Sequence, residues 1–153
     1  MDSVIEKVKI DVSDITLSDI EDNEVRLADF KGKTVVMAGA KREGADEARR
    51  WGKELSKKCE PLQNVQYVRI AFVGKIPAFV PRKFIKGLLK GSGSTVPPLI
   101  AWDNDSAEKM GVYDSKAPYI FIIDPEGIMR LRFRGQYTED DLSRILEYIP
   151  NSY

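Results

Sequence analysis

The sequence has no histidine and a single cysteine, Cys59, among its 153 residues. Without histidine, the commonest general base and metal ligand of proteins is missing, which excludes histidine triads and most zinc sites. A single cysteine cannot form a disulfide within the chain. The carboxylates Asp103, Asp105 and Asp114 do not have the spacing of a calcium loop. We therefore expect neither a metal nor another cofactor.

A long apolar run and an excess of one charge are also missing. No apolar run approaches the 18 residues of a membrane span, and no basic leader with an apolar centre stands at Met1. The 24 Lys and Arg balance the 24 Asp and Glu, so only a local patch could attract nucleic acid or an anionic membrane. We expect no nucleic-acid partner and no membrane span. The compartment stays open, with a cytoplasmic location favoured, or export if a leader has been trimmed.

The length fits one domain, and a domain of this size buries roughly 68–70% of the surface that its unfolded chain exposes. We assign residues 1–13 to an N-terminal strand or arm and residues 14–150 to a single domain. The sequence leaves the oligomeric state open.

The stretch from Ala117 to Gly127 is central to the prediction. Its apolar run, Tyr119 to Ile123, does not alternate, which is typical of a strand covered on both faces. Asp124 to Gly127 then predicts a tight turn. The following strand alternates, so we expect a β-hairpin partner with two different faces. One face should carry Met129, Leu131 and Phe133, and the other Arg130, Arg132 and Arg134.

A strand–helix–strand unit precedes this hairpin. Thr34 to Ala38 is nearly all apolar and predicts a second buried strand. A helix should begin near Glu43–Asp46 and run to about Lys58, with Cys59 on its buried stripe. Val65 to Val73 should form the next strand, joined by a right-handed crossover.

The other elements are shorter. Pro81 should begin a helix that runs from Arg82 to Lys90. Residues 96–102 predict an extended piece, and their two prolines argue against a central place in the sheet. Ser106 should cap a short helix, and Thr138 with Asp141 should cap the last one.

This order of elements resembles the thioredoxin fold in its redoxin form, the group of AhpC/TSA peroxiredoxins and TlpA/ResA-like thiol–disulfide proteins. The resemblance rests on four segments, which are Asp14–Leu17, Val25–Lys33, Trp102–Tyr113 and Ala117–Gly127. It implies an α/β three-layer sandwich whose mixed central sheet is flanked by helices, with an N-terminal β-hairpin extension. It also implies a cis peptide bond at Pro118, while the sequence itself leaves the isomer open and is equally consistent with a proline that only shapes the start of the strand. The dipeptides Ile76-Pro77 and Phe79-Val80 are similar, more loosely, to the YtfJ-type group, which lacks the cysteine pair.

The sequence departs from the redoxin pattern where the chemistry is expected. That family carries Cys-x-x-Cys at the start of the first long helix, and this sequence has Glu43-Gly44-Ala45-Asp46 there. A peroxiredoxin nucleophile is missing as well. Cys59 lies about 24 Å along the helix, near its negative end, where a thiolate is disfavoured. We therefore predict a structural Cys59. The alternative is an antioxidant or oxidoreductase that uses Cys59 with an external thiol.

The resemblance further implies a shallow groove between the helix start and the loop at Pro118, which binds extended peptides or small thiol substrates in that family. Lys41 and Arg42 beside the helix N-terminus can hold an anion, but Glu43 and Asp46 compete for the same amides. Capping of the helix by these two carboxylates is the preferred interpretation, and binding of a ligand is the alternative. We expect a redox-inactive binding module whose partner is a protein, a peptide or a small anionic ligand. The groove would be lined by Lys41, Arg42, Glu43, Gly44, Ala45, Asp46, Ala117 and Pro118.

Three further groups of residues have a structural and a functional interpretation. The arginine row at 130, 132 and 134 could meet an acidic partner, but protection of an exposed strand is the preferred explanation. The basic residues Arg82, Lys83, Lys86 and Lys90 predict a solvated helix face. Phe79, Trp102 and Tyr113 could line an apolar pocket, but such aromatics more often belong to the core.

Overall fold

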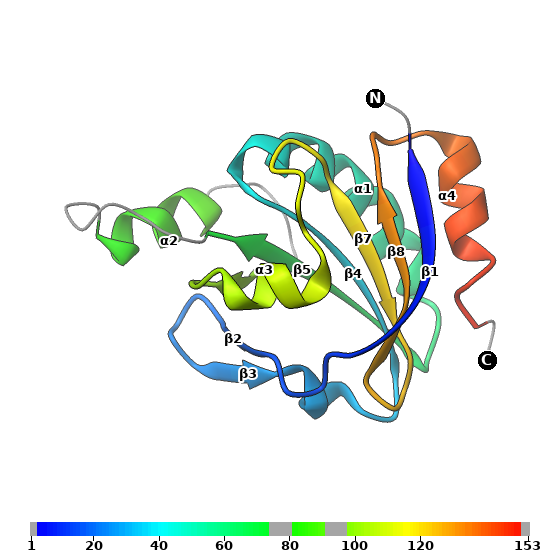
Figure 1. Cartoon of the computed structure of the whole chain (residues 1–153), viewed down its shortest axis with the longest axis horizontal. Coiled ribbons are helices and arrows are strands. Elements are labelled where there is room, and N and C mark those ends of the chain that lie inside the picture. Colours follow the sequence, from blue (N-terminus) through cyan, green and yellow to red (C-terminus); the bar gives the residue numbers. More distant parts are fainter. Residues whose placement is uncertain (1–2, 74–80, 91–97, 151–153) are drawn as a thin grey trace.

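The computed structural model describes residues 3–73, 81–90 and 98–150 (Figure 1). The strands are β1 (Val4–Asp11), β2 (Thr16–Ser18), β3 (Glu24–Arg26), β4 (Thr34–Ala40), β5 (Val65–Phe72), β6 (Pro98–Ala101), β7 (Tyr119–Ile123) and β8 (Ile128–Arg134). The α-helices are α1 (Ala45–Cys59), α2 (Arg82–Lys90), α3 (Asp105–Met110) and α4 (Glu139–Leu146), and the 3-10 helices are η1 (Leu27–Phe30) and η2 (Arg42–Gly44).

All of these strands join one mixed sheet with the order β1-β8-β7-β4-β5-β6-β2-β3. The central strand β4 runs parallel to β5 and antiparallel to β7, and β6 continues the parallel part beside β5. β1 forms one edge of the sheet, where it runs antiparallel to β8. The predicted mixed α/β sheet, including the N-terminal β2–β3 hairpin, is confirmed.

Helices cover both faces of the sheet. On one face, α1 and α4 bury Trp51, Leu55 and Ile145 against the sheet. On the other face, α3 contributes Met110, and the N-terminal segment contributes residues such as Val12 and Ile15. Figure 1 shows α1 and α3 on opposite sides of the central strands. The sheet therefore separates two apolar cores.

The two strands predicted as central are buried along their whole length. All seven residues of β4 and all five of β7 are buried. In β7, Ile120 and Ile122 face the α1 side, whereas Phe121 and Ile123 face the α3 side. Because each face meets an apolar layer, the strand needs apolar side chains at every position.

The alternation in β8 is interrupted by a bulge. Ile122 pairs with Leu131 and the next residue, Ile123, pairs with Met129, so Arg130 is an extra residue. Leu131 therefore faces the α1 side and Met129 the α3 side, which corrects the prediction of a single shared face. A bulge depends on how two strands pair, so alternation within one strand does not reveal it.

Two local predictions are wrong. β6 lies inside the sheet between β5 and β2, although its pairing with β2 is a single residue pair, Ser18 with Ile100. Pro98 is tolerated because it is the first residue of that strand. Ser106 does not cap α3. Instead, Asp103 Oδ1 accepts hydrogen bonds from the amides of Asp105 at 3.1 Å and Ser106 at 3.4 Å.

The last helix begins as predicted. Thr138 Oγ1 accepts a hydrogen bond from the Asp141 amide at 3.0 Å, and three acidic residues occupy the first turn. An acidic first turn also favours the positive end of the helix dipole. The capping prediction for Thr138 is confirmed.

We expect Gly39→Ala to lower the free energy of unfolding by about 1–3 kcal/mol, because overpacking a core forces its neighbours to shift. A Cβ atom at Gly39 would lie 2.6 Å from the backbone oxygen of Ile70 on β5. Urea unfolding followed by circular dichroism measures the change. Gly87→Ala is the control, since a Cβ at Gly87 on α2 meets open space. Equal unfolding midpoints for Gly39→Ala and the wild type would contradict this packing.

Candidate functional site

The candidate site begins where β4 ends and the chain turns through η2 into α1. Gly44 is the N-cap of α1, and no side chain caps the helix. Asp46 forms an ion pair with Arg49 in the next turn. The predicted capping by Glu43 and Asp46 is therefore wrong, because Asp46 lies inside the helix, where it pairs with a residue three positions later.

The helix start packs directly on the loop before β7. A Cβ atom at Gly44 would lie 2.7 Å from the backbone oxygen of Ala117 and 3.1 Å from the Cβ of Ala40. Only glycine fits this approach of two backbone segments. The start of α1 and the loop before β7 are therefore in direct backbone contact at Gly44 and Ala117.

Pro118 is buried and its peptide bond is trans, since the described residues contain no cis peptide bond. The cis bond implied by the resemblance is therefore wrong here. The trans form is favoured intrinsically by about 0.5–1 kcal/mol. The Pro118 carbonyl also accepts a hydrogen bond from the Gly135 amide at 3.2 Å, which extends the β7–β8 pairing.

A depression of about 310 Å³ opens beside the Gly44–Ala117 contact, at the carboxyl ends of β4 and β5. Three of the eight predicted groove residues, Lys41, Arg42 and Glu43, line it. The other five do not. The full lining consists of Lys41, Arg42, Glu43, Phe72, Val73, Asp103, Asn104, Ala107 and Ser115.

Sequence reasoning missed the six lining residues from outside the η2 region. In α/β sheets, ligands bind beyond the carboxyl ends of the parallel strands. That rule, applied to the predicted strand–helix–strand unit, would have indicated Phe72 and Val73 at the end of β5. Asp103, Asn104 and Ala107 carry no comparable signal, because their place depends on how α3 packs after β6.

The lining of the depression contains charges of both signs and apolar side chains. Lys41 and Arg42 are basic and Glu43 and Asp103 are acidic, while Asn104 and Ser115 add polar groups that can donate and accept hydrogen bonds. Phe72, Val73 and Ala107 supply apolar surface. Such a lining can hold a ligand that combines polar groups with apolar ones.

Cys59 lies at the far end of α1 from this depression. Its side chain is 2% exposed and belongs to the core between α1, α4 and the sheet. Burial raises the pKa of the Cys59 thiol to about 11. The prediction that Cys59 is buried is confirmed, and its thiol is almost entirely protonated at neutral pH.

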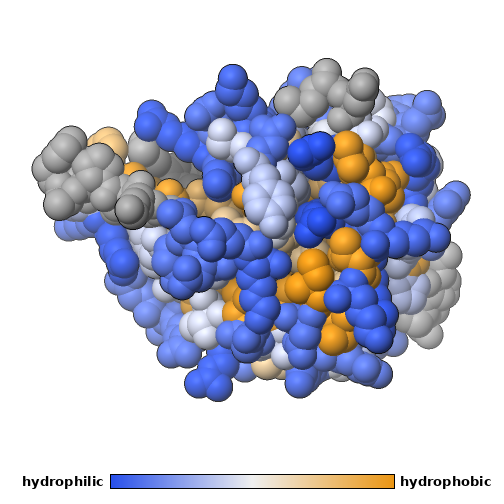
Figure 2. Space-filling model, viewed as in Figure 1, coloured by the Kyte–Doolittle hydropathy of each residue, from blue (hydrophilic) through white to orange (hydrophobic). Residues whose placement is uncertain are grey.

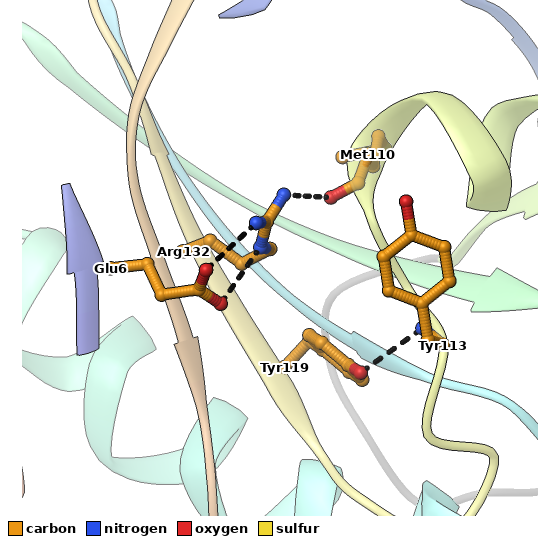
Figure 3. A network of polar contacts seen from close by, with 5 residues as sticks. All are labelled: Glu6, Met110, Tyr113, Tyr119 and Arg132. Carbon is orange, nitrogen blue, oxygen red and sulfur yellow. Dashed lines mark hydrogen bonds and ion pairs between the residues drawn. The ribbon is translucent and has the colours of Figure 1, made fainter. Parts of the chain in front are cut away.

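The arginine row does not guard a sheet edge, because β8 lies between β1 and β7. The Arg132 guanidinium reaches Glu6 on β1 at 3.1 Å and the Met110 carbonyl at the end of α3 at 3.1 Å (Figure 3). The preferred sequence explanation is therefore wrong. Arg132 instead links β8 to the edge strand β1 and to the end of α3.

Of the aromatic residues Phe79, Trp102 and Tyr113, the two that the structure describes differ in burial. Tyr113 is 76% exposed, so it is not a core residue, and only its amide is held, by the Tyr119 hydroxyl at 3.2 Å (Figure 3). Trp102 is half-buried. Phe79 lies outside the described residues, as do the residues that resemble the YtfJ-type group.

Within the described part of the chain, no cluster of three or more His, Cys, Asp or Glu could hold a metal ion. Over the same residues, every helix is too short or too polar to cross a bilayer.

Three solved structures share this architecture. The exposed lipoprotein thioredoxin of Streptococcus pneumoniae has a TM-score of 0.69 and 20% identity, over 89% of this chain and 99% of that one. A DsbF homologue from Corynebacterium diphtheriae has a TM-score of 0.67 and 20% identity, over 96% of this chain and 92% of that one. A secreted thiol-disulfide isomerase from Corynebacterium glutamicum has a TM-score of 0.66 and 16% identity, over 94% of this chain and 88% of that one. These likenesses show a thioredoxin-like fold.

Comparison with curated protein sequences gives no significant match. The family model described as AhpC/TSA family matches residues 8–132, which is most of the chain. The match includes the strand–helix–strand unit, α3 and most of the β7–β8 hairpin. This protein therefore belongs to the AhpC/TSA family.

Proposed function

We propose that this protein is a redox-inactive member of the AhpC/TSA family that binds a protein or peptide partner. The observation that carries the proposal is the position of the single cysteine. The start of α1 holds no thiol, and the one cysteine of the sequence is buried at the opposite end of that helix.

The chemistry of thiol–disulfide exchange supports this proposal. The attacking species is an accessible thiolate, and reactive cysteines occur where a helix N-terminus or a nearby cation lowers their pKa. Cys59 has the reverse surroundings, since burial raises its pKa and it ends α1 on the side of the negative dipole. Neither attack on a disulfide nor attack on a peroxide is favoured there.

The open depression supports the binding part of the proposal. Its lining combines the basic Lys41 and Arg42 with two carboxylates and with apolar side chains. An extended peptide offers carbonyls, amides and side chains of both kinds, so it matches this mixed lining better than a simple anion does. A small anionic ligand held by Lys41 and Arg42 is the second candidate for the same place.

We expect Cys59 to react with a disulfide reagent about 100-fold more slowly at pH 8 in the folded protein than in urea. A thiol with the ordinary pKa of 9.0 is about one-tenth thiolate at pH 8, and one with a pKa of about 11 is about one-thousandth thiolate. Release of the coloured thiolate from the reagent measures the rate. Equal rates with and without urea would show an accessible, reactive Cys59.

The redox prediction is tested by insulin reduction and by peroxide consumption, each with dithiothreitol as the external thiol. We expect the wild type and Cys59→Ser to be equally inactive, because neither presents a thiolate at the surface. Turnover that disappears in the serine variant would support the alternative, an oxidoreductase that uses Cys59.

The binding prediction is tested with peptides selected from a random phage-displayed library on the wild type. We expect Lys41→Glu with Arg42→Glu to weaken the selected peptides about tenfold, because an ion pair near the surface contributes about 0.2–1 kcal/mol and a tenfold loss corresponds to about 1.4 kcal/mol. Lys57→Glu with Lys58→Glu, at the exposed end of α1, is the matched control. Inorganic phosphate serves as competitor and tests the anionic alternative. Peptides that bind all three proteins equally would place the binding surface elsewhere.

A further inference from the structure

The cations of the described residues are held to different degrees by the chain itself. On α2, the Arg82 guanidinium lies 4.6 Å from the centre of the Trp102 ring, and the Lys86 ammonium pairs with Asp22 in the β2–β3 turn. Residues 82 and 86 are four apart and share one side of α2, which corrects the prediction of a fully solvated basic face. Arg132 is held more completely. Its side chain is 13% exposed, against 19–65% for the other ion-paired cations in the same part of the chain.

Arg132 connects three elements through one guanidinium (Figure 3). Its Nε donates to Glu6 Oε1 at 3.3 Å and its Nη2 to Glu6 Oε2 at 3.1 Å, which forms a two-pronged pair with β1. Its Nη1 donates to the Met110 carbonyl at 3.1 Å, where α3 ends. The next residue, Gly111, has a left-handed backbone, and a Cβ atom there would collide with the Arg132 guanidinium. The end of α3 therefore needs glycine to admit this side chain.

The hydroxyl of Tyr119 holds the next residues of the same connection. It accepts hydrogen bonds from the amide of Tyr113 at 3.2 Å and from the amide of Asp114 at 2.9 Å. The Tyr119 ring is 2% exposed and stacks on Phe121 in β7, with the ring centres 5.9 Å apart. Because the strand and the ring are buried, the position of the hydroxyl is fixed. Arg132 and Tyr119 therefore contact the beginning and the middle of the connection between α3 and β7, residues 111–118.

This α3–β7 connection brings residues to the candidate site. The Asp114 carbonyl accepts a hydrogen bond from the Ala117 amide at 3.4 Å, which folds the chain into a turn. Inside that turn, Ser115 lines the depression. The Ala117 carbonyl lies against Gly44 at the start of α1, and α3 itself lines the depression with Ala107. One wall of the depression therefore depends on how the α3–β7 connection is held.

We propose that Arg132 and Tyr119 are positioning residues, which hold the α3–β7 connection in the form that places Ser115 at the depression. This inference rests on the proposed function, because it assigns both residues to the same binding site. Neither residue belongs to the lining, so both act through the backbone of the connection. A binding site is precise only when the groups behind it are fixed. Glu6 contributes from β1, because it fixes the Arg132 guanidinium.

The contacts of Arg132 favour this role over recognition of an acidic partner. Each of the three guanidinium nitrogens already donates to Glu6 or to the Met110 carbonyl. On the face that Figure 2 shows, hydrophobic residues reach the surface in separate groups among hydrophilic ones. Scattered groups of this kind are normal on protein surfaces and do not indicate a docking area. The Arg132 side chain thus serves contacts within the chain.

Amide hydrogen exchange tests the proposal without a ligand. Arg132→Lys keeps the charge but loses the planar fork that reaches both acceptors, and Tyr119→Phe removes only the hydroxyl. We expect the amides of residues 111–117 to exchange about tenfold faster in each variant, because the connection opens more often when these hydrogen bonds are lost. Arg130→Lys is the matched control, since the Arg130 guanidinium pairs with Asp124 at 2.7 Å, at the turn of the β7–β8 hairpin.

The affinity for the peptides selected on the wild type then tests the effect on the depression. We expect Arg132→Lys and Tyr119→Phe each to weaken these peptides about tenfold, and Arg130→Lys to leave the affinity unchanged. Fluorescence polarisation of labelled peptides measures the affinity, and circular dichroism gives the folded fraction of each variant. A purely structural role would lower the unfolding midpoint and leave the affinity of the folded protein unchanged.

Unchanged exchange in both variants would overturn the proposal, as would faster exchange with unchanged affinity. An equal loss of affinity in Arg130→Lys would overturn it too. If Lys41→Glu with Arg42→Glu weakens the peptides and the two variants do not, the proposed function stands and this inference fails. If the wild type selects no peptide, the proposed function fails, and the exchange rates alone decide whether the two residues hold the connection.

Discussion

The burial of β4 between β5 and β7 is the constraint on which the rest of the structure depends. Both neighbours pair with β4 along nearly its whole length, and both of its faces are covered. The approach is so close at Gly39 that no side chain fits against Ile70. Because the end of β4 is fixed, the position of η2 and of the α1 N-terminus is fixed with it. The core therefore fixes the position of the candidate site, and no cysteine side chain is needed to hold it there.

Because the core alone fixes the candidate site, an AhpC/TSA protein can lack a cysteine at the start of its first long helix. A catalytic dithiol or peroxidatic thiol sits at the surface and contributes little to a core of this size. In this chain the contact of Gly44 with Ala117 occupies part of that surface, and Lys41, Arg42 and Glu43 border the depression beside it. The scaffold thus keeps an open depression at the carboxyl edge of the sheet, although no cysteine lies at the start of α1.

The sequence predicted correctly those features that depend on one element and its immediate surroundings. The unbroken apolar runs identified β4 and β7 because both faces of those strands are covered, and Thr138 identified the start of α4 because a cap is a local interaction. The bulge at Arg130, the inner place of β6 and the exposure of Tyr113 depend on pairing between distant segments. The depression was found only in part for the same reason, since its lining comes from the ends of several elements.

The chain connects the depression to α2 on both sides of β6. The connection from β5 to β6 begins at Val73, which lines the depression, and it contains α2. After β6, Trp102 stacks with Arg82 of α2, and the next residue, Asp103, lines the depression and accepts hydrogen bonds from the first two amides of α3. Because Trp102 and Asp103 are consecutive, the contact that holds α2 lies next to the lining of the depression in the chain.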